Sequence, residues 1–256
     1  MRSETMLDRE QLIMLKERKE HVIGLQMRAI EEGKVSPTRM NSLNRPLGKH
    51  LQDFWIGCYM LGEPFEGNLQ KAKDCFSKFL AVYKEASSLS VRRYYLFAAV
   101  LCEETRTDIL DILAGPAFSE EMASIYGLSN IEVIQSFTLA NYLLERYGSI
   151  IENEQSFMEI EQKWGGDSEM YSCWTKAIVS LIEKDEAGLY AALETILTEH
   201  KGMRERGSLC DYALGELCLP ALVFLKLAKK AGMNVKIDNP LAPRELVELD
   251  LIGVKK

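Results

Sequence analysis

The sequence predicts an all-α protein, a multi-helix array of antiparallel helical hairpins around a central apolar helix at about residues 209–231. Three observations support this fold class. Apolar residues recur at three-and-four spacing through most of the chain, and no stretch of useful length alternates apolar and polar residues as a β-strand does. Turns rich in Gly, Pro and Ser separate the periodic segments, which is typical of short connections between antiparallel helices.

The segment Leu209–Ala231 is the most apolar run of the chain. On a helix its charged residues fall within one arc of about 140°, so neighbouring elements must cover the other sides. Its uninterrupted apolar part is too short to cross about 30 Å of hydrocarbon. Pro220 lacks an N–H group and either kinks this helix or begins a second one, and Gly232 is expected to end it.

Four helices are expected in the first part of the chain. The first carries Leu12, Ile23 and Ile30 at helical spacing, and a loop containing Pro37 and Pro46 is expected to follow it. The expected helices cover about residues 5–32, 48–61, 65–87 and 91–114.

Further helices are expected in the middle and the last part of the chain. Ser119 and Ser129 can each cap a helix, and Gly148 is expected to end the second of these. Trp174 begins a helix whose partner follows a tight turn at residues 184–186. The expected helices cover about residues 119–127, 129–147, 154–164, 174–182 and 187–200, with a last short one within 240–249.

The best break in composition is the turn Gly165-Gly166-Asp167. It separates an N-terminal helical region, residues 1–165, from a C-terminal helical region, residues 166–256. The 256 residues suffice for one large domain or two small ones, and the two regions are expected to pack as one compact unit.

The net charge of −7 argues against general nucleic-acid binding, which needs clustered Lys and Arg, but it permits a basic protein partner. The six cysteines lie scattered without a C-x-x-C pair, as reduced thiols of a cytosolic protein do. The first thirty residues carry acidic side chains where a secretory signal needs an apolar run. We therefore expect a cytoplasmic protein with no membrane partner.

Recognisable catalytic patterns are absent from the sequence. The three histidines do not have metal-ligand spacing, and the chain has neither a phosphate-binding P-loop nor a G-x-S-x-G motif. We therefore expect no metal, no cofactor and no enzymatic activity. His200 is expected at the end of a helix, where its interaction with the helix dipole is the simplest interpretation; a role as a ligand or as a catalytic base is the alternative.

Acidic residues give the candidate binding site. On a helix over residues 91–114, four carboxylates would share an arc of about 140°, which is either a solvated face or a docking face for a cationic protein. A second acidic group, with lower weight, lies before the Gly165-Gly166 turn together with an aromatic residue that can anchor an interface. The candidate partner-binding residues are Glu103, Glu104, Asp108, Asp111, Glu159, Glu161 and Trp164, with Glu152 and Glu154 beside them.

The order of segments in the last ninety residues carries a resemblance. A Trp-led helix, a short turn, a helix ending in His, an apolar helix ending near a Gly and a short hydrophobic stretch follow one another. The segments are Trp174-Thr-Lys-Ala177, Asp185, Leu197-Thr-Glu-His200, Leu225–Gly232, Asn234-Val-Lys-Ile237 and Asn239-Pro-Leu-Ala-Pro243. This order resembles the C-terminal half of the immunity protein 49 family of bacterial polymorphic-toxin systems, over about residues 170–247. The family has a Tyr-Leu-Pro-like segment where this chain reads Pro240-Leu-Ala-Pro243.

The resemblance implies a non-enzymatic inhibitor that binds a cognate toxin domain by direct protein–protein contact and neutralises it. The toxin is expected to be basic if the acidic residues steer its approach. Two alternatives stay open: a helical scaffold that binds a peptide or a partner helix, and an enzyme that uses His200. The protein is expected to be a monomer or a homodimer.

Overall fold

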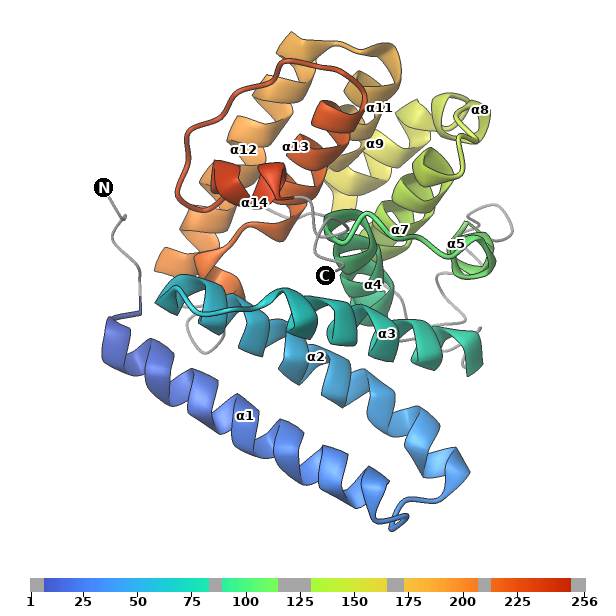
Figure 1. Cartoon of the computed structure of the whole chain (residues 1–256). Coiled ribbons are helices and arrows are strands. Elements are labelled where there is room, and N and C mark those ends of the chain that lie inside the picture. The colour runs from blue at the N-terminus through green and yellow to red at the C-terminus, as the bar shows by residue number, and fades with distance from the viewer. Residues whose placement is uncertain (1–6, 83–88, 115–129, 165–172, 207–212, 250–256) are drawn as a thin grey trace.

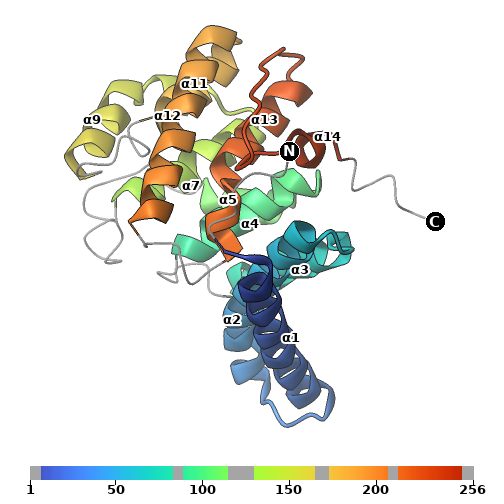
Figure 2. The ribbon, with the colours of Figure 1, turned by 90° about the vertical axis from the view of Figure 1, so that its left-hand side faces the viewer.

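In the computed structural model, the described residues form twelve α-helices and one 3-10 helix, which pack together (Figure 1). No β-strand occurs within the described parts of the chain, so the predicted all-α fold class is confirmed. Helices α1 to α3 lie on one side of the molecule and most of the later helices on the other (Figures 1 and 2). The structure describes residues 7–82, 89–114, 130–164, 173–206 and 213–249.

The bounds of the helices in the first half are α1 (Arg9–Glu31), α2 (Pro37–Leu61), α3 (Glu66–Val82), α4 (Leu89–Leu101), α5 (Thr107–Leu113) and α7 (Asn130–Leu143). Those of the second half are α8 (Gly148–Ile151), α9 (Glu154–Trp164), α11 (Trp174–Glu183), α12 (Glu186–Glu205), the 3-10 helix η1 (Ala213–Glu216), α13 (Leu219–Lys230) and α14 (Arg244–Glu248).

Helices α1 and α2 form a long hairpin whose far end projects from the body of the molecule (Figure 2). Helix α1 begins at a capping box, because the Asp8 carboxylate accepts the N–H of Gln11 at 2.8 Å and the Gln11 side chain accepts the N–H of Asp8 at 3.0 Å. Gly33, with a φ of 63°, follows its end.

The loop expected around Pro37 and Pro46 is wrong, because both prolines lie in α2. Ser36 caps this helix by accepting the N–H of Arg39 at 3.3 Å, and Pro37 occupies a first-turn position where no N–H is needed. Pro46 lies inside the helix, which continues because the following residues Leu47 and Leu51 are buried in the core.

The single helix expected over residues 91–114 is also wrong. Helix α4 ends at Leu101, and Glu103 adopts a left-handed φ of 53°. The N–H of Glu104 then donates to the carbonyl of Ala99 at 3.0 Å, which closes the helix end as in a Schellman motif. Residues 102–106 form a turn, and α5 begins after it.

From residue 213 onward, the central apolar segment forms two helices, the 3-10 helix η1 and then α13 from Leu219, which is one of the two outcomes that the sequence left open. Pro220 lies in the first turn of α13 and therefore begins a helix rather than kinking one. Apart from Pro220, every side chain from 219 to 228 is buried, and α13 contacts α4, α11, α12 and α14. Gly232, with a φ of 77°, ends the helix as expected.

The remaining boundaries agree in part with the sequence. Helix α9 has its expected ends, whereas α7 ends at Leu143 and Glu145 takes a left-handed φ of 58° ahead of Gly148. Helix α12 continues past His200 to Glu205. The helix expected over residues 119–127 lies outside the described residues.

One hydrophobic core extends across residue 165. The Trp174 ring on α11 contacts Phe97 on α4 and Phe224 on α13, at centroid distances of 6.0 and 4.8 Å. Its Nε1–H donates to the Thr138 hydroxyl on α7 at 3.1 Å. Trp174 thus joins four helices on both sides of residue 165.

Helix α14, near the end of the chain, contacts α2. The Tyr59 hydroxyl on α2 donates to the Glu245 carboxylate at 2.7 Å. Leu246 and Leu249 help to close a cavity of about 10 Å³ beside Trp55 and Phe65. No helix within the described ranges is long and apolar enough to cross a membrane.

Candidate protein-binding site

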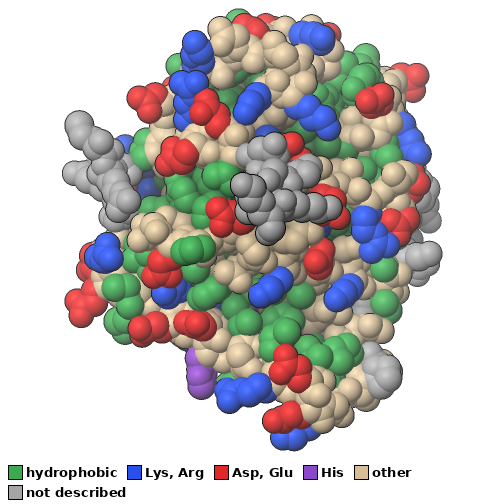
Figure 3. All heavy atoms as spheres, in the orientation of Figure 1, with side chains coloured by type: hydrophobic (Ala, Val, Ile, Leu, Met, Phe, Trp, Pro, Cys, Tyr) green, Lys and Arg blue, Asp and Glu red, His purple; other side chains and the backbone are tan. Residues whose placement is uncertain are grey.

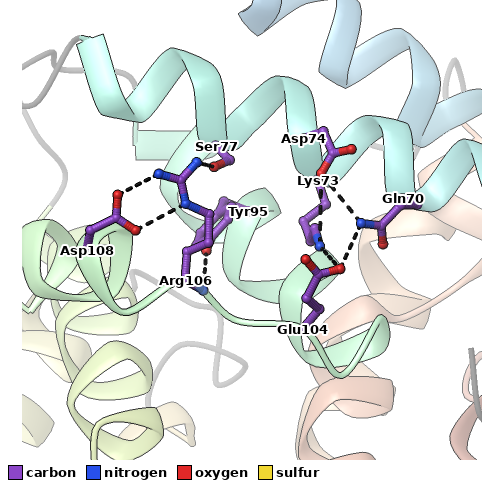
Figure 4. A network of polar contacts seen from close by, with 8 residues as sticks. All are labelled: Gln70, Lys73, Asp74, Ser77, Tyr95, Glu104, Arg106 and Asp108. Atoms are coloured by element: carbon purple, nitrogen blue, oxygen red, sulfur yellow. Dashed lines mark hydrogen bonds and ion pairs between the residues drawn. The ribbon is translucent and has the colours of Figure 1, made fainter. Parts of the chain in front are cut away.

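The first four candidate carboxylates do not share one helix face. Glu103 and Glu104 lie in the turn after α4, whereas Asp108 and Asp111 lie on α5. Each of them has a cation within the chain, and Figure 4 shows two of these ion pairs. The pairs are Glu103 with Lys226 at 2.9 Å, Glu104 with Lys73 at 2.6 Å, Asp108 with Arg106 at 2.5 Å and Asp111 with Arg146 at 2.7 Å.

Two of the four cations are buried. The Lys73 and Lys226 side chains are 2% and 4% exposed, and their ammonium groups meet the turn that follows the C-terminus of α4. Positive charge is favourable near a helix C-terminus. The Lys226 ammonium also donates to the carbonyl of Leu249 at 2.7 Å. These pairs attach the turn to α3 and α13 and neutralise the two glutamates.

Arg106 attaches the same turn to α3 and α4 (Figure 4). Its backbone N–H donates to the Tyr95 hydroxyl at 3.1 Å, and its guanidinium donates to the Ser77 hydroxyl at 3.0 Å and to both oxygens of Asp108. The hydrogen bonds from Arg106 lower the pKa of Asp108. This region therefore presents ordered ion pairs, and acidic and basic side chains are interspersed on the face in Figure 3.

The different burial of these pairs gives a stability prediction. Glu104→Ala should lower the free energy of unfolding by about 1–3 kcal/mol, because it leaves the buried ammonium of Lys73 without its carboxylate. Asp108→Ala is the matched control, since it removes an ion pair in which both side chains are about half exposed, and its loss should be clearly smaller. Urea unfolding of both variants measures the difference. Equal losses would show that Lys73 does not depend on Glu104.

The candidate residues of the second acidic group lie in different environments, some exposed and one buried. Glu159 is exposed on α9 and accepts a hydrogen bond from Gln155 at 2.8 Å. Glu161 is fully buried and its oxygen accepts the Thr175 hydroxyl at 2.8 Å, so its expected place on a binding surface is wrong for this conformation. Burial raises the pKa of Glu161 to about 8. Trp164 is the last residue of α9, and its side chain lies outside what the structure describes.

His200 is buried within α12 rather than at the helix end. Its Nε2 lies 3.2 Å from the carbonyl of Gly215, which can only accept, so Nε2 carries the proton. Burial lowers the pKa of His200. One turn later Arg204 lies 3.5 Å from the buried carboxylate of Glu216, which also accepts the N–H of Leu7. This cluster connects α12, η1 and the N-terminal segment.

The cysteines described by the structure are unpaired and buried. Burial raises the pKa of Cys102 and Cys218 to about 12, so these thiols stay protonated at neutral pH. Among the described residues, no group of three His, Cys, Asp or Glu side chains is placed to hold a metal ion.

A groove between α11 and α12 was not found from the sequence. It has a volume of about 380 Å³, and the first residue of α9 lies at its edge. Small side chains form much of its lining, and the exposed Ala191 and Lys176 show that it opens to solvent. The lining residues are Glu154, Cys173, Lys176, Val179, Ser180, Glu183, Gly188, Ala191, Ala192 and Thr195.

Gly188 is needed at this position. It lies in the first turn of α12, where its N–H donates to the Asp185 cap at 3.0 Å. A Cβ at residue 188 would lie 2.2 Å from the Asp185 carboxylate and 2.7 Å from the Ser180 hydroxyl. The glycine therefore allows the tight connection between α11 and α12 and keeps this part of the groove open.

Three charged residues line the groove: Glu154, Lys176 and Glu183. Within the described parts of the chain, none of the three has an ion-pair partner within 4.0 Å. Lys176 lies in the first turn of α11, and Glu183 is its last residue. Both charges oppose the helix dipole, which costs about 0.3–1 kcal/mol for each exposed charge. Charges that are unfavourable for their own helix are expected at functional sites, where binding rather than stability determines the residue.

The sequence held a weak signal for this groove. Gly188, Ala191, Ala192 and Thr195 fall on one side of α12, and the reversed charges of α11 are also visible in the sequence. Periodicity alone treats this side of α12 as an ordinary helix face, because it does not show that α11 leaves a groove beside the small residues.

Comparison of the chain with protein-family models, with curated proteins and with solved structures gives no match.

Proposed function

We propose that this protein is an immunity protein that binds a cognate bacterial toxin domain by direct contact and neutralises it without catalysis. The observation that carries this proposal is the groove between α11 and α12, where three charged side chains have no ion-pair partner among the described residues. A groove on a packed helical hairpin is a preformed surface, so a partner that binds there does not have to order it. Apart from Glu154, the residues that line the groove lie within residues 170–247, the part of the sequence that resembles the immunity family.

A helical scaffold that binds a partner helix is the second candidate, and the same groove supports it. The two candidates differ in what the partner does. An immunity protein must remove the toxicity of its partner in the cell, whereas a scaffold leaves the activity of its partner intact or localises it.

Co-expression with each protein encoded beside its gene, followed by affinity capture, tests the proposal. We expect one neighbour to be toxic when expressed alone, to form a complex of nanomolar Kd, and to lose its toxicity when this chain is present. The variant Ala191→Arg, which fills the groove at an exposed helical position, should weaken this complex. A neighbour that binds tightly but is harmless would favour the scaffold, and the absence of any toxic or binding neighbour would contradict the immunity function.

A further inference from the structure

We infer that the groove between α11 and α12 receives one helix of a partner protein, and that this helix carries an acidic and a basic residue seven positions apart. The inference deepens the proposed function, because it names the part of the partner that is recognised. It is carried by the groove walls, by the size of the lining side chains and by the spacing of the two charges on α11.

The groove walls favour a helix over an extended segment. The walls are two α-helices, whose interior backbone N–H and C=O groups are bonded within each helix. An extended segment would find no backbone partners there and would leave its own polar groups unpaired. A helix satisfies its own backbone and can present one face of side chains to a groove.

The lining of the groove allows close approach. Ser180, Gly188 and Ala191 have the smallest side chains that a helix wall can carry, and Ala191 is exposed. A volume of about 380 Å³ is enough for the side chains on one face of a helix. The backbone of that helix would rest on the outer edges of α11 and α12. We therefore expect alanine and leucine on the face of the partner helix that enters the groove.

The charges define the pattern on the partner. Lys176 and Glu183 are seven residues apart on α11, which is two helical turns, or about 10 Å. A partner helix that lies along α11 would meet both charges if it carried an acidic residue opposite Lys176 and a basic residue opposite Glu183. These two side chains would also be seven residues apart, and their order along the partner depends on whether the helices run parallel or antiparallel.

Labelled model peptides test this inference with the full-length protein. Each peptide has about 20 residues, enough to form a helix on binding, with an Ala and Leu stripe and Gln elsewhere. One peptide carries Glu followed by Lys seven positions later, a second carries Lys followed by Glu, and a third carries Gln at both positions. Fluorescence anisotropy gives the Kd of each.

We expect one of the two charged peptides to bind and the Gln peptide to bind about tenfold more weakly. Glu183→Lys and Ala191→Arg should each weaken the preferred peptide by about tenfold or more. Glu17→Lys, an equal change of charge on the exposed surface of α1, should leave the Kd unchanged. No peptide binding, or equal binding by wild type, Glu183→Lys and Ala191→Arg, would overturn the inference.

The double variant Lys176→Glu with Glu183→Lys separates recognition from folding. It places each charge in the orientation that the dipole of α11 favours, so the protein should fold at least as stably as wild type. It should bind the peptide with the opposite charge order more tightly than the peptide that wild type prefers. An unchanged preference would also overturn the inference.

The two proposals can fail separately. If a toxic neighbour binds wild type and Ala191→Arg equally well, the immunity function stands and the groove is not its contact surface. If the peptides bind as expected while no neighbouring protein binds, the groove recognises a helix and the immunity function is wrong.

Discussion

Trp174→Ala is expected to lower the free energy of unfolding by about 3–5 kcal/mol, which is a large part of the stability of an ordinary domain. Trp174 is 2% exposed and packs between Phe97 and Phe224, so a cavity would open among α4, α11 and α13. The change also removes the indole N–H that donates to Thr138. Urea unfolding followed by circular dichroism measures the loss.

Tyr190→Ala is the control for this experiment. Tyr190 lies on the neighbouring helix α12 and is 46% exposed, so its replacement should change the free energy of unfolding by about 0.5 kcal/mol or less. A loss below about 1 kcal/mol for Trp174→Ala would mean that the packing around this ring contributes little to stability.

Glu161→Gln is expected to make the protein more stable at pH 8 than wild type, and to change its stability much less at pH 5. Burial raises the pKa of Glu161 to about 8 in the folded protein, against an ordinary value of 4.5. The folded state therefore holds a proton that the unfolded state has already released. The stability that this proton provides is complete below pH 4.5 and is lost as the pH rises toward 8, by at most about 1.4 kcal/mol per pH unit.

The measurement is the free energy of unfolding of wild type and Glu161→Gln at several pH values between 5 and 8. Gln keeps an oxygen that can accept the Thr175 hydroxyl, so the local geometry is preserved. The difference between the two proteins should grow with pH, and contributions from other groups such as His200 cancel in it. Glu159→Gln, on the exposed side of the same helix, is the matched substitution. Parallel curves for wild type and Glu161→Gln would contradict the raised pKa of Glu161.

The all-α fold could be predicted because periodicity records which side of each helix is buried. The boundaries depended on contacts that no local pattern contains. Pro46 predicts a loop when only its neighbours in the sequence are considered. Burial of the residues that follow it stabilises α2 through this position. Glu103 reads as part of a long helix, but its left-handed conformation allows Lys226, more than a hundred residues later, to pair with it.

The candidate site was harder to predict for a related reason. Spacing along one helix can show that carboxylates lie near one another, but it cannot show which cations approach them. Lys73 and Lys226 come from other helices and neutralise the two glutamates. Glu154, by contrast, carried only low weight in the sequence, and the structure places it at the edge of the groove. The lining of this groove comes from three helices, α9, α11 and α12, so the pattern of any one helix does not predict it.

The contact of α14 with α2 has a consequence for synthesis on the ribosome. Tyr59 and Glu245 are 186 residues apart, so at about 5–20 residues per second the N-terminal helices emerge roughly 10–40 s before their covering helix. During that interval the side of Trp55 and Phe65 that later faces Leu246 and Leu249 stays open to water or to a chaperone. Chains that terminate before α14 would keep this apolar surface exposed, so loss of the last helix should promote aggregation.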